Sequence, residues 1–306
     1  MSAVIAAVLQ LAGVLLAPLA PGTIQTLKAR LQGRRGPSPL QPYRTLRRLW
    51  KKSSVVPEGA GVVYWLAPAF IAACMLVALA IVPVAGRAGD FGVGHDALAL
   101  IGVLALARFA LAASAWDTGN GFSLMGVARD GTLAVFTEAL LALTLLVAAL
   151  PAHSTDLRAM VLAAAGTRIW QQAAHWCGAA AFVLVILVET GRQPVDNPDT
   201  HLELTMIHEG PLLEYAGRDL ALLQWSAQAR HWIVLLLGAE LFAPHPASFA
   251  GAFAALAATL AAECVALALI ETAQAKMRTL RVPALLGLGC LVALAGIGTF
   301  IAGVAT

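Results

Sequence analysis

Eight apolar segments constrain this chain more than any other feature of its sequence. Each comes close to the roughly 20 predominantly apolar residues that a helix needs to cross a bilayer. They cover residues 2–20, 60–84, 97–114, 131–150, 170–188, 219–243, 249–271 and 282–304. With 59% hydrophobic and only 12% charged residues among 306, a soluble fold could not bury this much apolar surface. We therefore expect an all-α, polytopic membrane protein of about eight transmembrane helices, formed as a single integral membrane domain over residues 1–306.

The cysteines and histidines do not predict a metal site. Each cysteine lies alone within an apolar segment, at Cys74, Cys177, Cys264 and Cys290. An iron–sulfur cluster needs several thiolates, some of them closely spaced. His208-Glu209 begins like the zinc motif His-Glu-x-x-His, but Leu212 stands where the second histidine is required. We expect this chain to bind no metal and no cofactor, and to hold no catalytic residue of its own.

Lys and Arg predict the orientation, because cytoplasmic loops of membrane proteins carry an excess of both. Fifteen of the 20 lie in loops on one side: Lys28, Arg30, Arg34, Arg35, Arg44, Arg47, Arg48, Lys51, Lys52, Arg129, Arg192, Arg218, Lys276, Arg278 and Arg281. The opposite side has Arg87, Arg158 and Arg168. We expect the basic side to face the cytoplasm, with both termini on the other side of the cytoplasmic (inner) membrane. The apolar run after Met1 lacks a basic flank and is interpreted as a retained helix, not a signal peptide.

The longest cytoplasmic loop, from Glu189 to Tyr215, is rich in carboxylates and proline. Pro194 and Pro198 flank Asp196 and stiffen the backbone around it. Apolar residues alternate with the acids further along, so part of the loop must pack on something. Two interpretations stay open from spacing alone: a solvated loop, as runs of charge usually are, or a rigid acidic loop at which protons enter.

The first basic loop, residues 28–43, also has two interpretations. A basic cluster beside a span is by default a topology signal that favours anionic lipid. The loop also contains Gly33, Gly36, Pro37, Pro39 and Pro42, which specify more backbone geometry than attraction to lipid requires. This pattern favours a shaped docking surface for a cytoplasmic protein.

Carboxylates inside the apolar segments are the third notable feature. Glu138, Glu240 and Glu263 lie within spans, and Glu271 lies at the inner end of the seventh. Charges in hydrocarbon are costly and usually face a bundle interior or a water path. These residues predict either a proton relay or structural ion pairs, for instance Arg230 with Glu240, or Arg108 with a neighbouring carboxylate.

Four blocks of the chain, in the right order, resemble one family. They are Lys28 to Tyr43 with its Gln-Gly-Arg-Arg-Gly-Pro run, Asp117-Thr118-Gly119 through Arg129, the loop Glu189 to Tyr215, and Glu271 through Pro283. The chain is identified by these blocks as a member of the complex I subunit 1 family. Its Thr205-Met206-Ile207-His208-Glu209 run resembles the branch found in membrane-bound [NiFe]-hydrogenases, of the formate hydrogenlyase subunit 4 and hydrogenase-4 component C type.

The resemblance implies a membrane subunit of an oxidoreductase complex. The implied partners are hydrogenase large and small subunits, an iron–sulfur protein and antiporter-like membrane subunits, with the iron–sulfur clusters and the NiFe centre held by those partners. The residues implied to face the partners are Arg30, Gln32, Arg34, Arg35, Pro37, Asp117, Arg129, Asp130, Arg192, Asp196, His201, Glu203, His208, Glu209, Glu214, Lys276 and Arg278. The candidates for proton transfer are Glu138, Glu189, Glu240, Glu263 and Glu271.

Two other functions remain as alternatives. A complex I subunit with a quinone chamber would share Arg192, Asp196 and Glu214 with this loop. A stand-alone secondary transporter would show duplicated halves and broken helices at the midplane of the bilayer. In this chain the specified polar residues gather at one face instead.

Overall fold

The computed structural model describes residues 2–89, 91–196, 207–246 and 248–304, and within these ranges the chain is helical and contains no strand. The α-helices are α1 (Ser2–Leu16), α2 (Leu19–Leu31), α3 (Gln41–Trp50), α4 (Val62–Ile81), α5 (Ala97–Thr118), α6 (Gly121–Ala149), α7 (Leu157–Ala164), α8 (Ala173–Glu189), α9 (Gly217–Phe242), α10 (Phe249–Ala273) and α11 (Val282–Val304). Three short 3-10 turns, η1 (Thr167–Gln171), η2 (Gly210–Leu212) and η3 (Thr279–Arg281), join them. The predicted all-α class is confirmed.

The described helices include five that are long and apolar enough to cross a membrane, or six if the bent pair α1 and α2 forms one span. The five are α4, α5, α6, α10 and α11 together with the short turn η3 that precedes it. Helix α8 is apolar but only 17 residues long, and α9 carries Arg230 and Glu240 along its 26 residues. A polytopic membrane protein is confirmed, and a total of eight spans stays a prediction.

The first apolar segment does not form one straight helix over residues 2–20. Helix α1 ends at Leu16, and α2 leaves it at an angle of 50°. Pro18 precedes α2, and proline supplies no N–H to continue the helical hydrogen bonds. The bend directs α2 so that Lys28 is buried, with 8% of its surface exposed.

Helix α6 begins ten residues before the predicted start of the fourth span. Gly119 adopts a left-handed conformation (φ 66°) and ends α5, and Asn120 caps α6 by accepting a hydrogen bond from the Phe122 N–H. Such a cap satisfies one of the free amides at a helix start. Arg129 and Asp130, expected in a loop, therefore lie on a helix.

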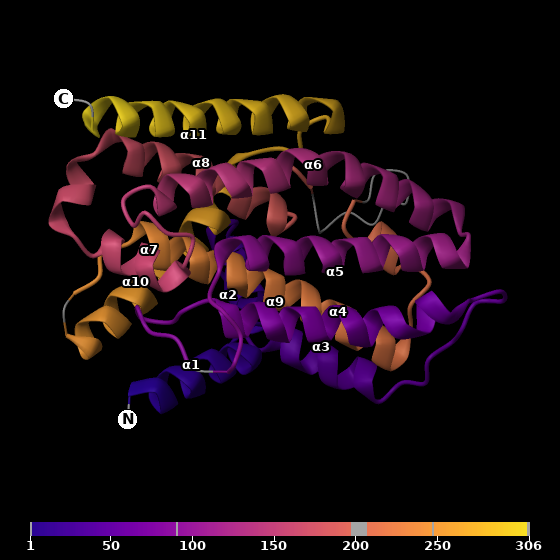
Figure 1. Ribbon diagram of the computed structural model, residues 1–306. Coiled ribbons are helices and arrows are strands. Elements are labelled where there is room, and N and C mark those ends of the chain that lie inside the picture. Colours follow the sequence, from indigo (N-terminus) through magenta and orange to yellow (C-terminus); the bar gives the residue numbers. More distant parts are fainter. Residues whose placement is uncertain (1, 90, 197–206, 247, 305–306) are drawn as a thin grey trace.

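Helix α9 is the core of the bundle (Figure 1). It packs against α3, α4, α8 and α10, while α8 packs against α6 and α11. Its middle contains Ile233, Leu235 and Leu237, each at most 1% exposed. Helices α1 and α11 lie at opposite edges, and both termini lie at the same end of the molecule (Figure 1).

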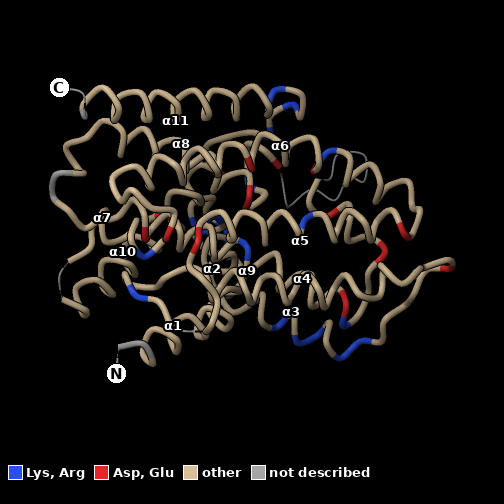
Figure 2. The backbone as a smooth tube through the Cα atoms, in the orientation of Figure 1, with Lys and Arg blue, Asp and Glu red and all other residues tan. Residues whose placement is uncertain are grey.

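Charged residues are unevenly spread. Figure 2 shows Lys and Arg following α3 and the loop after it along one edge of the molecule. The middle of the bundle holds a smaller group of charges of both signs (Figure 2). That group forms the candidate site.

Candidate functional site

Arg108 on α5 is the centre of a buried group of charges. Its side chain is 13% exposed and contacts three carboxylates: Nη1 lies 2.9 Å from Oε1 of Glu138, Nη2 lies 2.8 Å from Oε1 of Glu189, and Nε lies 3.5 Å from Oδ2 of Asp130. Asp130 and Glu138 are eight residues apart on α6, so about two turns of that helix face Arg108. The expected pairing of Arg108 with a neighbouring carboxylate is confirmed.

Glu189, the last residue of α8, is held by two guanidinium groups. Its other oxygen, Oε2, lies 2.9 Å from Nη1 of Arg230 on α9. Arg230 also donates to the carbonyl of Leu104 at 2.6 Å. The expected pairing of Arg230 with Glu240 is wrong: Arg230 and Glu240 are ten residues apart on α9, about 15 Å along a helix.

His208 links this group to the cytoplasmic loop. Its Nε2 lies 3.9 Å from Oδ1 of Asp130, and its Nδ1 lies 3.4 Å from Oδ2 of Asp196. Gly191, with φ +60°, leaves room for the His208 ring, because a Cβ at position 191 would lie only 3.0 Å from His208 Nδ1. Burial opposes a charge on His208, but the hydrogen bond with Asp196 and the negative charges of both aspartates raise its pKa above the ordinary value.

Asp196 has a second cationic partner, Lys276, which precedes α11. Lys276 Nζ donates to Asp196 Oδ1 at 2.8 Å. Burial alone would raise the pKa of Asp196, but the hydrogen bonds from His208 and Lys276, with their positive charges, lower it well below its usual range. Met277 N–H donates to the carbonyl of Pro194 at 2.8 Å, which fastens the loop to the link before α11.

A second buried ion pair joins the start of this loop to α10. Arg192, 6% exposed at its side chain, places Nη1 3.1 Å from Oε1 of the fully buried Glu271 on α10. Lys28 on α2 lies 3.6 Å from the other oxygen of Glu271. Two predicted site residues, Arg192 and Glu271, are thus joined to Lys28, which was not predicted, at the start of the loop. Asp196 lies four residues further along the loop.

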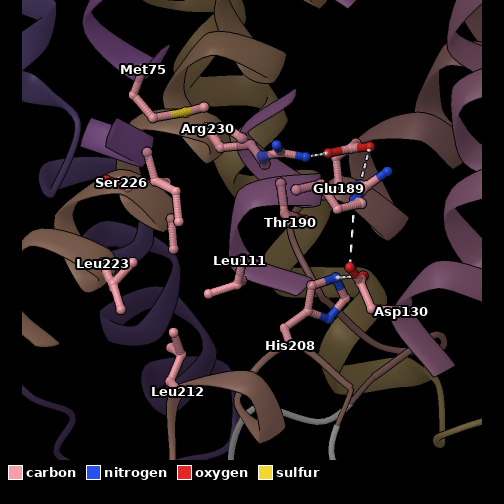
Figure 3. A pocket seen from close by; sticks show the side chains of 14 residues that line it. Met75, Leu111, Asp130, Glu189, Thr190, His208, Leu212, Leu223, Ser226 and Arg230 are labelled. Atoms are coloured by element: carbon pink, nitrogen blue, oxygen red, sulfur yellow. Dashed lines mark hydrogen bonds and ion pairs between the residues drawn. The ribbon is translucent and has the colours of Figure 1, made fainter. Parts of the chain in front are cut away.

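A cavity of about 150 Å³ lies among these charges. Figure 3 shows Arg230 pointing toward Glu189, with His208 and Asp130 side by side nearby and Met75, Leu111, Leu212 and Leu223 on the apolar wall. The cavity is large enough for ordered water, and its polar wall supplies partners for it.

A larger cavity of about 680 Å³ adjoins the first. The two share Thr190, His208, Leu212 and Ala227 as wall residues. Residues of α2, α3, α9 and the loop complete the larger one, including Gln25, Gln41, Asp196, Glu209, Tyr215 and Gln224. Two of its α9 residues are unsatisfied: His231 Nε2 and Gln228 Oε1 are buried and find no hydrogen-bond partner among the described residues.

The end of the loop is fixed to the ends of α4, α5 and α6. Tyr215 stacks on Tyr64 with ring centroids 4.4 Å apart and donates to the Tyr64 carbonyl at 3.1 Å. Tyr64 donates in return to the Glu214 carbonyl at 3.0 Å, and Asn120 donates to the Glu214 carboxylate. Asp117 accepts the Tyr64 N–H at 2.9 Å. Burial, chiefly, raises the pKa of Tyr215 to about 12, so its hydroxyl stays protonated.

Two of the predicted carboxylates lie apart from this network. Glu240 is fully buried and accepts the N–H groups of Ala85 at 2.5 Å and Gly86 at 2.9 Å. Glu263 lies against α9 where Gly238 leaves room, since a Cβ there would lie 3.0 Å from Glu263 Oε1. Its Oε2 is buried and has no hydrogen-bond partner among the described residues.

The remaining predicted residues are placed as follows. The basic-loop residues Arg30, Gln32, Arg34, Arg35 and Pro37 are exposed, as is Arg278. Arg129, Glu209 and Glu214 are half-buried. His201 and Glu203 lie outside the described residues. Within those residues no group of three or more His, Cys, Asp or Glu side chains is arranged to hold a metal ion.

Several residues of the site were not predicted. Lys28 was counted only as part of a basic loop, and His231, Gln228 and Tyr64 were not singled out at all. The sequence feature that could have identified Lys28 is its position near the end of the first apolar segment and its proline, from which its side chain can reach the bundle interior. No sequence signal marks Tyr64, whose role depends on the packing of Tyr215.

Comparison with known proteins settles the family. The model of the family described as NADH dehydrogenase matches residues 3–303. This chain belongs to that family. The family is of the complex I subunit 1 type, and the resemblance inferred from the four sequence blocks is confirmed.

The relatives include proteins of two kinds. The chain is 36% identical to hydrogenase-4 component C of Escherichia coli (strain K12) over 236 residues, 75% of this chain and 72% of that protein. It is 32% identical to formate hydrogenlyase subunit 4 of the same organism over 237 residues, 74% of this chain and 73% of the relative. It is also 32% identical to a subunit of the NADH-quinone oxidoreductase of Cereibacter sphaeroides (strain ATCC 17029 / ATH 2.4.9), covering 69% and 66% of the two chains.

A solved structure shares the fold. A chain of the membrane-bound sulfane sulfur reductase, an archaeal respiratory membrane complex, superposes with a TM-score of 0.80. The alignment covers 95% of this chain and 97% of that one, at 16% sequence identity. The two chains therefore share one arrangement of helices.

Proposed function

We propose that this chain is the membrane subunit of a membrane-bound [NiFe]-hydrogenase complex of the formate hydrogenlyase type. It docks the electron-transferring subunits and couples their redox chemistry to the movement of protons or another cation. The hydrogenase large and small subunits, an iron–sulfur protein and antiporter-like membrane subunits are the proposed partners, and these carry the iron–sulfur clusters and the NiFe centre. Identity to both hydrogenase-branch relatives, at 36% and 32%, supports this choice.

One observation carries the coupling role: a connected series of charges runs from the loop into the helices. It passes from Asp196 through His208 and Asp130 to Arg108 and Glu189. Two unit charges 4 Å apart interact by about 4 kcal/mol at an effective dielectric constant of 20. A change of charge or position at the loop is therefore transmitted to Glu189 through neighbours in contact.

The docking face in this proposal is the end that carries the exposed Arg30, Gln32, Arg34, Arg35, Pro37 and Arg278 together with the loop residues Arg192, Asp196, His201, Glu203, His208, Glu209 and Glu214. We place this end in the cytoplasm and both termini on the other side of the cytoplasmic membrane. The bias of Lys and Arg toward these loops supports that orientation.

Among the carboxylates, we assign proton movement to Glu138, Glu189, Glu263 and Glu271. Glu138 and Glu189 both pair with Arg108, and Glu271 pairs with the loop residue Arg192. Glu263 stands eight residues before Glu271 on α10, about 12 Å along the helix. Bound water would have to bridge that distance. We assign Glu240 a structural role, because backbone amides hold it.

The direct test is purification of the complex through this chain. Affinity capture followed by protein identification should recover the two hydrogenase subunits and an iron–sulfur protein. The matched functional test is Asp196→Asn, which should lower coupled turnover while dye-linked hydrogenase activity remains. Glu58→Gln, an exposed carboxylate in the loop before α4, is the control and should leave both rates unchanged. Recovery of the chain without any redox subunit would contradict the proposal.

A second function is favoured by the larger cavity and by the relative from NADH-quinone oxidoreductase. A volume of about 680 Å³ lies within the usual range for small-ligand sites, and a quinone head group would meet His231 and Gln228 there. A photoreactive quinone analogue that labels residues 207–231, with NADH-oxidising subunits in the captured complex, would support this alternative. Uptake of a substrate by the chain alone in liposomes would instead favour a transporter.

A further inference from the structure

Helix α3 presents two opposite faces. One side carries Pro42, Tyr43, Leu46, Leu49 and Trp50, and the other carries Arg44, Arg47 and Arg48, with Lys51 and Lys52 directly after the helix. This separation follows from the helical period of 3.6 residues. A helix with a basic face and an aromatic, apolar face is typical of segments that lie in the plane of a membrane interface.

The five cations of this helix are all exposed, and none has a carboxylate partner among the described residues. Arg48 makes only a long contact of 3.4 Å with the Thr45 hydroxyl. Figure 2 shows these residues along one outer edge of the molecule. By contrast, the cations of the candidate site are buried and paired, so the α3 cations are available for a partner outside the chain.

The position of α3 in the chain brings it to the membrane surface. In the sequence it lies between α2, which with α1 has the length and hydropathy of a bent span, and α4, which is long and apolar enough to cross the membrane. Gly22 of α2 lies against Pro39 and Pro42, and Tyr43 donates to the Leu15 carbonyl, so the start of α3 is fixed to the bend between α1 and α2.

Two exposed tryptophans flank the loop between α3 and α4. Trp50 at the end of α3 is 53% exposed, and Trp65 in the first turn of α4 is 54% exposed. Val62 beside it is 71% exposed. Tryptophan is enriched where membrane meets water. A docking face for an acidic protein partner would need the cations but would not call for apolar and aromatic residues exposed next to them.

We propose that α3 is a binding surface for the head groups of anionic phospholipids. Clusters of four to eight Lys and Arg beside a span attract such lipids, and here Arg44, Arg47, Arg48, Lys51 and Lys52 form the cluster. The lipid phosphates sit on the basic face, while the apolar face packs mainly on α9 and α2 and only the exposed Trp50 reaches toward the acyl chains. The surface is separate from the docking residues assigned above.

The experiment uses the assembled complex in nanodiscs that contain equal amounts of phosphatidylglycerol and phosphatidylcholine. A photoreactive form of one lipid or the other is included, and label on residues 41–56 is measured after digestion at sites other than Lys and Arg. We expect phosphatidylglycerol to label this segment about tenfold more than phosphatidylcholine, and the preference to fall in 1 M salt.

The variant R44Q/R47Q/R48Q/K51Q should bring the ratio of the two labels close to one. The double variant R47Q/K51Q, with the two residues one turn apart, should lower it about threefold and serves if the fourfold change prevents assembly. R44K/R47K/R48K keeps the charge and should keep the preference. R34Q/R35Q removes two exposed cations from the loop before α3 and should also keep it.

Three results would overturn the proposal. The wild-type segment could label equally with both lipids, or either Gln variant could keep the full preference. The α3 segment could also stay unlabelled until a partner protein is stripped from the complex, which would show that a protein covers this surface.

Discussion

Glu189 and Glu240 are both buried carboxylates, but they are held in opposite ways. Glu189 pairs with the guanidinium groups of Arg108 and Arg230 at 2.8 and 2.9 Å. Glu240 accepts two backbone N–H groups, those of Ala85 and Gly86, and no ion pair is found for it among the described residues. A cation that pairs with several carboxylates can shift toward the others when one of them loses its charge. A backbone amide, in contrast, keeps a fixed partial charge and a fixed position.

Under the proposed function, this difference distinguishes a carboxylate that takes part in coupling from one that only holds the fold together. Around Glu189 each cation has further partners, since Arg108 also contacts Asp130 and Glu138. The charges there act as one network that reaches the loop. Glu240 instead fixes the turn between α4 and α5 to the end of α9, and His245 bonds to its carbonyl at 2.6 Å. Burial of a carboxylate therefore does not identify a proton carrier unless its partners are known.

The largest effect should come from removing the shared cation. Arg108→Met leaves the buried Glu189 and the half-buried Asp130 and Glu138 without their common partner, and we expect a loss of about 3–5 kcal/mol in stability. Thermal unfolding of the purified complex, with the fraction assembled, measures it. Arg158→Met, an exposed arginine at the opposite end, is the matched control. An unchanged unfolding temperature for Arg108→Met would mean that the network contributes little to the fold.

The contrast with Glu240 predicts a loss of stability without a loss of coupling. Glu240→Ala leaves the N–H groups of Ala85 and Gly86 without an acceptor, at a cost of about 2–4 kcal/mol. Glu240→Gln keeps one acceptor oxygen and should cost about half as much. In both variants the coupled rate per assembled complex should match that of the wild type. A specific loss of coupled turnover in Glu240→Gln would return this residue to the proton path.

The smallest effect concerns His208 and depends on pH. The pKa of His208 is raised in the folded state. The stabilisation that protonated His208 gives the fold is therefore fully present below about pH 6.5, and it is lost as the pH rises through the folded-state pKa. The lowered pKa of Asp196 keeps that partner ionised down to below about pH 4. His208→Gln should therefore lower stability by about 1 kcal/mol at pH 6 and by less above pH 8.

The measurement for His208 is the difference in unfolding temperature between variant and wild type across this pH range. His153→Gln, an exposed histidine at the other end, should show no such trend. A deficit that grows toward alkaline pH would have the wrong sign for a protonated His208.

Much of the fold follows from the sequence because the bilayer imposes a length and a composition on each span. The apolar segments at 60–84, 97–114 and 249–271 correspond to α4, α5 and α10. The bend after Leu16 was not predicted, although Pro18 gives a physical reason for it. The early start of α6 was missed because Arg129 and Asp130 look like loop residues until their partners are known.

The sequence predicted several residues of the site, but not which residues pair with one another. Glu138, Glu189 and Glu271 stood out as carboxylates in or beside apolar segments, and spacing along a single helix can link Glu263 with Glu271. The partners of Arg230, however, come from α8 and from the backbone of α5. Contacts between helices far apart in the sequence depend on packing, which periodicity does not encode.

The most direct measurement compares Glu189→Gln with Glu240→Gln in the purified complex, reconstituted in liposomes. The quantity is the ratio of coupled turnover to dye-linked hydrogenase activity. The Glu189 variant should lower this ratio at least about tenfold, because the amide can neither carry a proton nor balance Arg108 and Arg230, and the Glu240 variant should leave it unchanged. Equal ratios in the two variants would contradict the view that the network around Arg108 couples electron transfer to ion movement.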